Sequence, residues 1–341
     1  MNNNKKRILV ITFLILTFLL IFLFLYQKKM KSQEEPISAT AFKLNTVVTI
    51  TIYDSQDTSL LDDALALCDH YEEIFSRTKE SSELYQLNQG LLPRSEKGFS
   101  ISSELEELIQ SGLFYGELSE GAFDISVEPI SSLWDFTSGE KVIPTKQKIQ
   151  DALSLVNYKN VKIKNGSLSF QQEGMGLDLG AIAKGFISDR IKDFLMSKGV
   201  KSATINLGGN VLCIGSKPDN TPFRIGIQKP FANRNETAAV VDITDKAVIS
   251  SGIYERYFEK DGKTYHHILD PKTGYPCETS LISVTIIADH GVDGDGLSTA
   301  CFSLGLEKGM ELINTLPDIQ AVFITDDYKL HYSDNFEHSE P

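Results

Sequence analysis

Residues 177–185, LDLGAIAKG, place an acid, two glycines and one lysine next to a strong helical pattern. Apolar residues recur at helical spacing from Ile182 to Leu195, which predicts a helix that starts inside this segment and ends near Gly199. A glycine turn entering a helix presents free backbone N–H groups and the positive end of the helix dipole, which favour a phosphate or carboxylate. Lys184 adds a mobile cation there. The alternative is a plain helix entrance with an acid near its start.

A carboxylate and a hydroxyl lie four positions apart at Asp295 and Thr299, where a helix over residues 295–304 is predicted to start. This spacing puts both side chains on one face of the helix. Their oxygens are hard ligands, which suit Mg²⁺ rather than zinc. The competing interpretation is that Asp295 caps the helix beside an ordinary surface threonine.

Two adjacent histidines precede a turn in residues 265–276, YHHILDPKTGYP. Neighbouring side chains on a strand point to opposite faces, so at most one of His266 and His267 faces a given pocket. The DPKTG turn fixes the end of the strand, which makes a histidine here a candidate for acid–base chemistry. A structural role for the same histidine stays open.

Two further acids, Asp124 and Asp178, stand in apolar surroundings. Their carboxylates suit hydrogen bonds from the hydroxyls or ring of a ligand, and they equally suit the capping of a loop. The chain has no GxGxxG, GxSxG, Walker or HExxH motif, so a dinucleotide fold of the Rossmann type and the common hydrolase sites find no support.

The elements that must position these residues indicate an α+β fold, because strands cluster and helices are few. Further helices are expected over residues 58–75, 103–118, 146–155 and 310–316, the first two opened by capping-box pairs Ser59/Asp62 and Ser103/Glu106. Strands are expected over residues 46–53, 223–228, 240–243, 247–250, 265–269 and 281–288, and the last over 321–324. Residues 203–211 are expected to form a strand and a glycine turn. Asn165-Gly166 predicts a two-residue hairpin within residues 161–170. Residues 121–136 fit neither period and are expected to form a buried loop against a ligand or core.

The composition limits the possible partners. With 341 residues and 41% apolar residues the chain is long enough for a substantial core, and its net charge of −13 argues against a nucleic-acid surface. An acidic protein that handles a phosphorylated ligand needs local cations or a metal. The four scattered cysteines show no zinc spacing and give no support for a disulfide; Cys68 and Cys301 are expected to be buried thiols.

Residues 8–26 are almost wholly apolar. Lys5, Lys6 and Arg7 precede this run, and Lys28, Lys29 and Lys31 follow it. The length of the run predicts one uncleaved transmembrane helix, although a cleaved signal peptide is the alternative. Residues 1–35 are therefore assigned to a membrane anchor and polar tether, and residues 40–335 to one exported domain. This places the domain outside the cytoplasm, held at the cell membrane.

Seven segments occur in an order that resembles the ApbE family of FAD:protein FMN transferases, over about residues 40–330. These are GAFDISVEP, LDLGAIAKG, INLGGNV, RIGIQKP, SSGIYERYF, YHHILDPKTGYP and DGLSTACFSLG. The resemblance implies a two-part α+β fold with mixed or antiparallel sheets and flanking helices, and a flavin nucleotide bound between the parts. It also implies Mg²⁺-dependent cleavage of FAD, transfer of FMN through a phosphoester to a threonine of an exported redox protein, and release of AMP.

The resemblance also implies roles for individual residues. The flavin-nucleotide site would include Ala122, Phe123, Asp124, Asp178, Lys184 and Leu269, and the metal ligands would be Asp295, Thr299 and the main-chain oxygen of Ala181. His267 holds the place of a catalytic or ligand-contacting histidine, and either His267 or Asp295 would be the base that takes the threonine proton. Leu44 stands where the family usually has the methionine of an MGT segment, and the missing glycine puts a flavin contact there in doubt.

Two other functions compete with flavin transfer. One is a metal-dependent FAD pyrophosphatase without a protein acceptor. The other is a non-catalytic flavin-binding protein at the cell surface, against which the Asp295/Thr299 pair and His267 speak.

Overall fold

The computed structural model describes residues 11–22, 35–136, 139–233 and 236–337. Residues 11–22 are helical, and the rest of the apolar run 8–26 lies outside the described residues. Within the described ranges, no helix has both the length and the apolar character needed to cross a bilayer.

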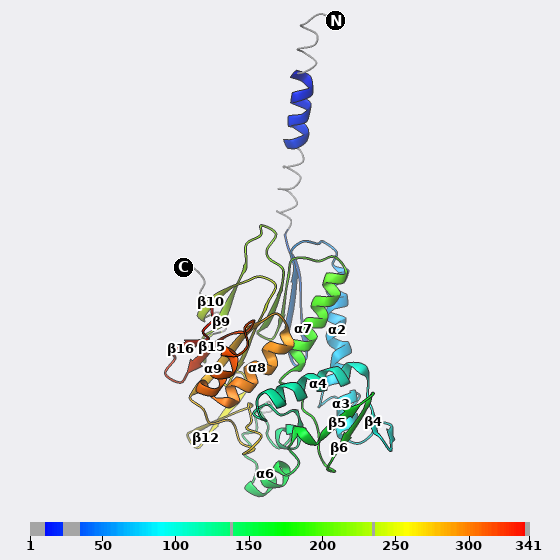
Figure 1. The fold of residues 1–341 in the computed structure, drawn as a ribbon, viewed down its shortest axis with the longest axis vertical. Helices are drawn as coiled ribbons and strands as arrows, with labels where there is room; N and C mark the ends of the chain where they lie inside the picture. The colour runs from blue at the N-terminus through cyan, green and yellow to red at the C-terminus, as the bar shows by residue number, and fades with distance from the viewer. Residues whose placement is uncertain (1–10, 23–34, 137–138, 234–235, 338–341) are drawn as a thin grey trace, which may run out of the picture.

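The centre of the fold is an eight-stranded antiparallel sheet in the order β1-β2-β7-β8-β11-β14-β15-β16 (Figure 1). Its strands are β1 (Ile37–Lys43), β2 (Thr46–Ile52), β7 (Ala203–Leu207), β8 (Asn210–Ile214), β11 (Ala247–Gly252), β14 (Leu281–Ala288), β15 (Gln320–Thr325) and β16 (Leu330–Tyr332). β14 is buried along its whole length because both faces of the sheet are covered there, which suits its nearly continuous apolar sequence LISVTIIA.

Helices cover one face of this sheet. They are α2 (Ser59–Phe75), α7 (Ala183–Ser197), α8 (Gly291–Leu304) and α9 (Leu306–Asn314). The core between helices and sheet includes Phe302 of α8 with Ile286 and Phe323 of the sheet, all of them fully buried. This layer carries the segments with LDLGAIAKG and DGLSTACFSLG.

A two-stranded ribbon, β9 (Phe223–Gln228) and β10 (Thr237–Ile243), covers part of the opposite face. Phe223 and Val241 of the ribbon pack against Val248 and Ile287 of the sheet. Because the neighbouring Ile249 belongs to the core on the helical side, the alternation of side chains along β11 separates the two cores.

A second part of the fold surrounds a four-stranded sheet. It comprises β3 (Arg94–Ser95), β4 (Gly98–Ser100), β5 (Val161–Lys164) and β6 (Ser167–Phe170), with α3 (Glu83–Asn88) and α4 (Ser103–Leu118). The turn between β5 and β6 has φ of 52° at Asn165 and 73° at Gly166, which confirms the predicted hairpin.

A small aromatic core joins the expected loop to the second half of the chain. The expected loop, residues 121–136, contains two short helices, η1 (Ile125–Val127) and α5 (Glu128–Ser131). The predicted helix α6 (Lys146–Leu153) and η2 (Tyr158–Asn160) follow it, and the second half adds the hairpin β12 (Tyr257–Lys260) and β13 (Lys263–His266). Trp134 packs with Phe258 and donates its Nε1–H to the carbonyl oxygen of Gly274 at 3.0 Å. The apolar run with the single tryptophan is therefore a buried segment that supports the DPKTG turn.

The α+β class and the antiparallel sheets are confirmed, but several local expectations are wrong. The sequence does not predict β1, β16 or α3. Because β16 follows β15, the expectation that residues 321–324 form the last strand is wrong. Asp57 accepts the N–H of Ser59 at the start of α2, and Ser102 accepts the N–H of Leu105 at the start of α4. The N-caps are therefore Thr58 for α2, which makes no side-chain cap bond, and Ser102 for α4, and both precede the predicted residues.

All four cysteines are buried free thiols. This confirms the expectation for Cys68 and Cys301. Burial raises the pKa of the Cys68 thiol to about 12, so it stays protonated and unreactive at neutral pH.

Candidate functional site

Two glycines set the close crossing of α7 and α8. A Cβ atom on Gly185 would lie 2.1 Å from the carbonyl oxygen of Gly291, and one on Gly291 would lie 2.2 Å from Ser188 Oγ. Only residues without a Cβ fit there. Asp189 then caps α8, because its carboxylate accepts the N–H of Gly291 at 2.6 Å and that of Val292 at 2.9 Å.

Asp295 is buried in the second turn of α8 and faces the start of α7. Its Oδ2 accepts the N–H of Gly185 at 2.5 Å, and its Oδ1 accepts an N–H of the Asn210 amide at 2.6 Å. Burial raises the pKa of this carboxyl, while the charge of Lys184 and the two hydrogen bonds oppose the rise. The carboxylate is thus fixed beside a cation. Because α8 already begins at Gly291, the prediction that Asp295 starts the helix is wrong.

The other two proposed metal ligands lie near the same crossing of helices. Thr299 is half-buried one turn further along α8, and its Oγ1 lies 3.0 Å from the Oγ of Ser251 on β11. Ala181 is exposed in the turn that leads into α7. In the described part of the chain, no three His, Cys, Asp or Glu side chains gather as a metal cluster. A cation here would therefore need hydroxyl, main-chain or water oxygens in addition to Asp295.

His267 follows β13 directly and is tied to the turn before β12. Its Nδ1 lies 3.2 Å from the carbonyl oxygen of Arg256, which also accepts the His267 backbone N–H at 3.1 Å. A carbonyl oxygen only accepts, so Nδ1 carries the hydrogen and Nε2 keeps its lone pair. Loss of water around the ring lowers its pKa to about 4, and the positive charges of Arg256 and Lys184 add to the effect. The ring is therefore neutral at pH 7.

His266 points away into the core, as alternation along the strand predicts. It is 6% exposed, packs edge-on against Phe302, and lies with Nε2 3.1 Å from the carbonyl oxygen of Cys277. Its Nδ1 is buried without a hydrogen-bond partner in the described structure. His266 is consequently a core residue.

The positive charge of Lys184 acts on two groups that are far from it in sequence. Its charge lowers the pKa of both the Asp295 carboxyl and the His267 imidazole. The hydrogen bond from the Gly185 N–H to Asp295 brings the segments of Lys184 and Asp295 into contact where α7 begins. The His267 ring lies close enough to feel the charge of Lys184.

Asp178 links the same segment to the loop that contains residues 122–124. Its Oδ2 accepts from Ser131 Oγ at 2.7 Å and pairs with Arg77 Nε at 3.0 Å, and its Oδ1 accepts the Gly180 N–H at 2.9 Å. The Asp178 backbone N–H reaches the carbonyl oxygen of Ile125 at 2.8 Å. Both oxygens of the Asp178 carboxylate thus already accept hydrogen bonds from groups of the protein.

Asp124 holds its own loop together. Its Oδ1 accepts from the N–H and hydroxyl of Ser126 at 2.7 and 2.6 Å, and its Oδ2 accepts the N–H of Tyr158 at 2.9 Å. Burial raises its pKa while these bonds oppose the rise. Ala122 and Phe123 beside it are buried. The side-chain contacts of Asp124 are therefore those expected of a residue that caps a loop, which was the alternative to ligand binding.

Leu44 lies in the turn of the β1–β2 hairpin, with φ of 53° there and 56° at Asn45. The hairpin end packs on the turn of the INLGGNV segment, because a Cβ on Gly208 would lie 2.2 Å from Thr46 Oγ1. Asn210, which holds Asp295, follows that turn. Leu44 therefore belongs to a separate hairpin, whose Thr46 contacts the turn that precedes Asn210.

Leu269 forms an isolated bridge with Pro276 across the turn after the histidines. Within the turn, the Gly274 N–H reaches the carbonyl oxygen of Asp270 at 2.8 Å, and the Asp270 N–H reaches that of Tyr275 at 2.8 Å. The predicted rigid turn is present, and Leu269 lies on the strand side of it.

Sequence reasoning missed three polar residues of this site: Arg77, Asn210 and Arg256. Asn210 offered one signal in the sequence, since it directly follows the glycine pair at 208 and 209 and precedes an apolar run. Arg256 contributes its main-chain oxygen, for which a side-chain pattern gives no signal.

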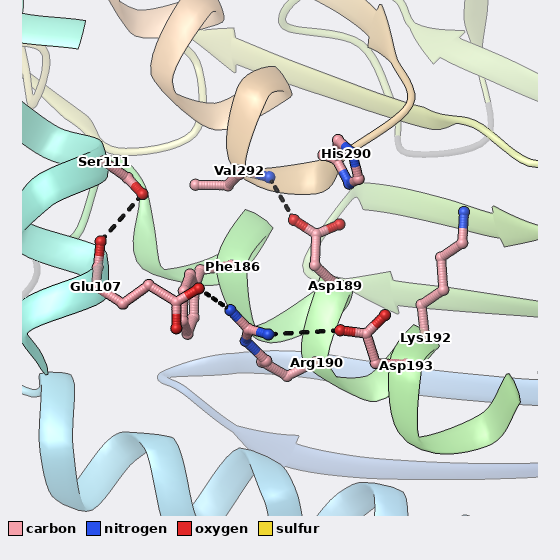
Figure 2. Close-up of a pocket in the computed structure, with 9 residues that line it drawn as sticks. All are labelled: Glu107, Ser111, Phe186, Asp189, Arg190, Lys192, Asp193, His290 and Val292. Carbon is pink, nitrogen blue, oxygen red and sulfur yellow. Dashed lines mark hydrogen bonds and ion pairs between the residues drawn. The ribbon is translucent and has the colours of Figure 1, made fainter. Parts of the chain in front are cut away.

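A separate pocket of about 280 Å³ lies beside α7, between α4 and the start of α8 (Figure 2). Arg190 pairs there with Glu107 and Asp193, and Lys192 pairs with Asp245 at 3.0 Å. None of the predicted site residues lines it. Its basic residues are compensated by these acids, so it offers no evident anion site.

The model of the ApbE family matches residues 44–323 of this chain. The chain belongs to the ApbE family. The FAD:protein FMN transferase of Klebsiella pneumoniae (strain 342) is 35% identical over 296 residues, which cover 86% of this chain and 90% of that protein. That of Treponema pallidum (strain Nichols) is 32% identical over 311 residues, covering 85% and 84%.

Solved structures agree with this assignment. The flavin transferase ApbE from Vibrio cholerae superposes with a TM-score of 0.78 at 28% identity, covering 89% of this chain and 98% of that one. The ApbE protein of Thermotoga maritima gives 0.79 at 31% identity, covering 88% and 97%. The predictions of an ApbE-family enzyme and of its fold are confirmed.

Proposed function

We propose that this chain is an FAD:protein FMN transferase, which cleaves the pyrophosphate of FAD and attaches FMN to a threonine hydroxyl of an exported redox protein. The name of its relatives supports the reaction class. The observation that carries the proposal is the contact of Asp295 with the start of α7, beside Lys184, whose charge also reaches the His267 ring. A reaction between a pyrophosphate and a hydroxyl needs positive charge to neutralise the phosphates and a base to take the hydroxyl proton. Lys184 would supply a cation, Asp295 a ligand for a metal ion, and His267 the base.

FAD would lie across the two parts of the fold. Lys184 is suited to its phosphates as a cation. Ala122, Phe123, Asp124, Asp178, Leu269 and Leu44 remain the proposed contacts to the nucleotide. Because the carboxylates of Asp124 and Asp178 already accept bonds from the protein, their main effect would be to hold the loops that contact FAD.

Asp295, Thr299 and the carbonyl oxygen of Ala181 would hold Mg²⁺. They fit this ion because all three offer hard oxygens, and because Asp295 is a buried carboxylate that faces the start of α7. When bound, Mg²⁺ neutralises charge on the pyrophosphate and on the leaving AMP.

The threonine oxygen forms a bond to the phosphorus of the FMN half while the bond from that phosphorus to the bridging oxygen breaks. AMP leaves with the bridging oxygen, and the hydroxyl proton moves to a base. We assign this role to His267 and not to Asp295. His267 is neutral with a free lone pair at Nε2, whereas both oxygens of Asp295 accept hydrogen bonds from α7 and β8.

A metal-dependent FAD pyrophosphatase would use the same residues, with water in place of the threonine. A gel assay separates the two functions. The full chain in detergent, with FAD, Mg²⁺ and a candidate acceptor, should make the acceptor fluoresce after denaturing electrophoresis. AMP release with no labelled acceptor would favour the pyrophosphatase, and FAD binding with no turnover would contradict both enzymes.

We also propose that residues 8–26 anchor the chain in the cell membrane with the domain outside the cytoplasm. The 19-residue apolar run and its basic flanks support this proposal. Protease added to intact cells should remove the domain and leave a membrane-bound fragment. Recovery of the intact chain in the soluble fraction would contradict the anchor.

A further inference from the structure

Three hydroxyl groups form a chain between β11 and α8. Ser251 Oγ lies 2.8 Å from Ser298 Oγ and 3.0 Å from Thr299 Oγ1. Ser298 Oγ in turn lies 3.1 Å from the main-chain carbonyl oxygen of Asp295. A hydroxyl has one hydrogen to donate and can accept through its lone pairs, so the chain has a direction.

The Asp295 carbonyl fixes that direction. A carbonyl oxygen only accepts, so Ser298 uses its single hydrogen in this bond. Ser298 must then accept from Ser251. Because the hydrogen of Ser251 is used there, Ser251 must accept from Thr299. The hydrogen of Thr299 therefore points to Ser251, and its remaining lone pair points elsewhere.

The packing of α8 on the sheet holds this arrangement. A Cβ on Gly294 would lie 2.8 Å from Ile249 Cδ1, so the missing side chain lets the helix approach β11. Ser251 stands two residues after Ile249 and shares its face of the strand. Ser298 is fully buried, which keeps water from competing for its hydroxyl.

We propose that Ser251 is a positioning residue that turns the lone pair of the Thr299 hydroxyl, and not its hydrogen, toward the cation. The inference rests on the proposed function, because that cation is the Mg²⁺ ion assigned to Asp295 and Thr299. A metal ligand must offer a lone pair, and neighbours that orient a ligand typically change metal affinity about 10- to 100-fold. Ser251 contributes through Thr299 and does not itself bind the ion.

The test is a calorimetric titration of Mg²⁺ alone into the full chain in detergent, without FAD. Ser251→Ala should weaken Mg²⁺ binding about tenfold or more. Ser250→Ala is the matched control: Ser250 is the adjacent serine of β11, and its Oγ instead pairs with Thr285 Oγ1 at 2.8 Å. This control should bind Mg²⁺ like the wild type. Equal weakening in both variants would contradict the inference.

Ser298→Ala tests the direction of the chain and provides a second variant if Ser251→Ala does not fold. Without Ser298 the Ser251 hydrogen is free to turn to Thr299, whose own hydrogen then faces the cation. Mg²⁺ binding should weaken although Ser251 and Thr299 are both intact. Unchanged binding would overturn the proposed direction. The melting temperature without Mg²⁺ serves as the check on folding for each variant.

Asp295→Asn separates failure of this inference from failure of the proposed metal site. If Asp295→Asn loses Mg²⁺ binding while Ser251→Ala keeps it, Ser251 does not position the ligand and the metal site stands. If both variants bind Mg²⁺ like the wild type, the metal assignment itself is wrong, and the inference is wrong with it.

Discussion

The carboxylate of Asp295 accepts the backbone N–H of Gly185 at 2.5 Å, across 110 positions of the chain. This bond joins the start of α7 to the second turn of α8. It also means that a protein carboxylate occupies part of the anion-binding end of α7, which the sequence suggested for a phosphate. Asp178 similarly takes the N–H of Gly180. Charge on Lys184 is therefore a more direct source of phosphate affinity at this end than free backbone N–H groups.

The crossing of α7 and α8 should not tolerate a side chain at Gly185. We expect Gly185→Ala to lower the free energy of unfolding by about 1–3 kcal/mol or more, because the added Cβ would overlap the carbonyl group of Gly291. Differential scanning calorimetry measures the change. Met196→Ala, at an exposed position of the same helix, should have little effect. An unchanged melting temperature in Gly185→Ala would show that the helices do not pack this closely.

His267 should stay neutral well below pH 6. Its pKa in the folded protein is lowered to about 4, against an ordinary value of 6.5. Between these values the unfolded chain binds more protons than the folded one, so this group's contribution to stability falls as the pH drops from 6.5 toward 4. His266, with its pKa also lowered to about 4, acts in the same direction. NMR titration of the imidazole gives the value directly, and a midpoint for His267 at or above 6.5 would contradict the described environment.

Lys184→Gln should change two measurable quantities together. Loss of the cation should weaken FAD binding about tenfold, which corresponds to about 1.4 kcal/mol. It should also raise the pKa of His267, because a positive charge that disfavours imidazolium is removed. Fluorescence titration with FAD and NMR measure the two effects. Lys192→Gln on the same helix is the control, since Lys192 pairs with Asp245. Wild-type FAD affinity in Lys184→Gln would exclude a phosphate role for this lysine.

Local signals predicted the elements that depend on neighbouring residues. The Asn165-Gly166 hairpin follows from turn chemistry alone, and the apolar stripe of α2 follows from its period. The sequence does not predict β1, because its residues ISATAFK include few large apolar side chains and adjoin the polar tether. The sequence predicts too late a start for α8 because GVDGDG is a poor helical sequence and the cap of the helix comes from Asp189, about a hundred residues earlier.

The residues of the candidate site fall into the same two groups: those that a local motif indicates, and those whose role depends on contacts between distant segments. Asp295, Lys184 and His267 could be found because their residue types and motifs are visible in sequence. The supports of this site could not. Asn210 and the main-chain oxygen of Arg256 acquire their roles only when distant segments meet. The hydroxyl of Ser251 likewise gains its partners only where α8 packs on β11.

The most direct test of the proposed function is mass spectrometry of an acceptor protein after reaction with the full chain, FAD and Mg²⁺. The account predicts one threonine-containing peptide that carries the mass of FMN less one water, with one AMP released for each modified threonine. Asp295→Asn should give neither product. Complete conversion of FAD to free FMN and AMP, with an acceptor that stays unmodified, would contradict flavin transfer.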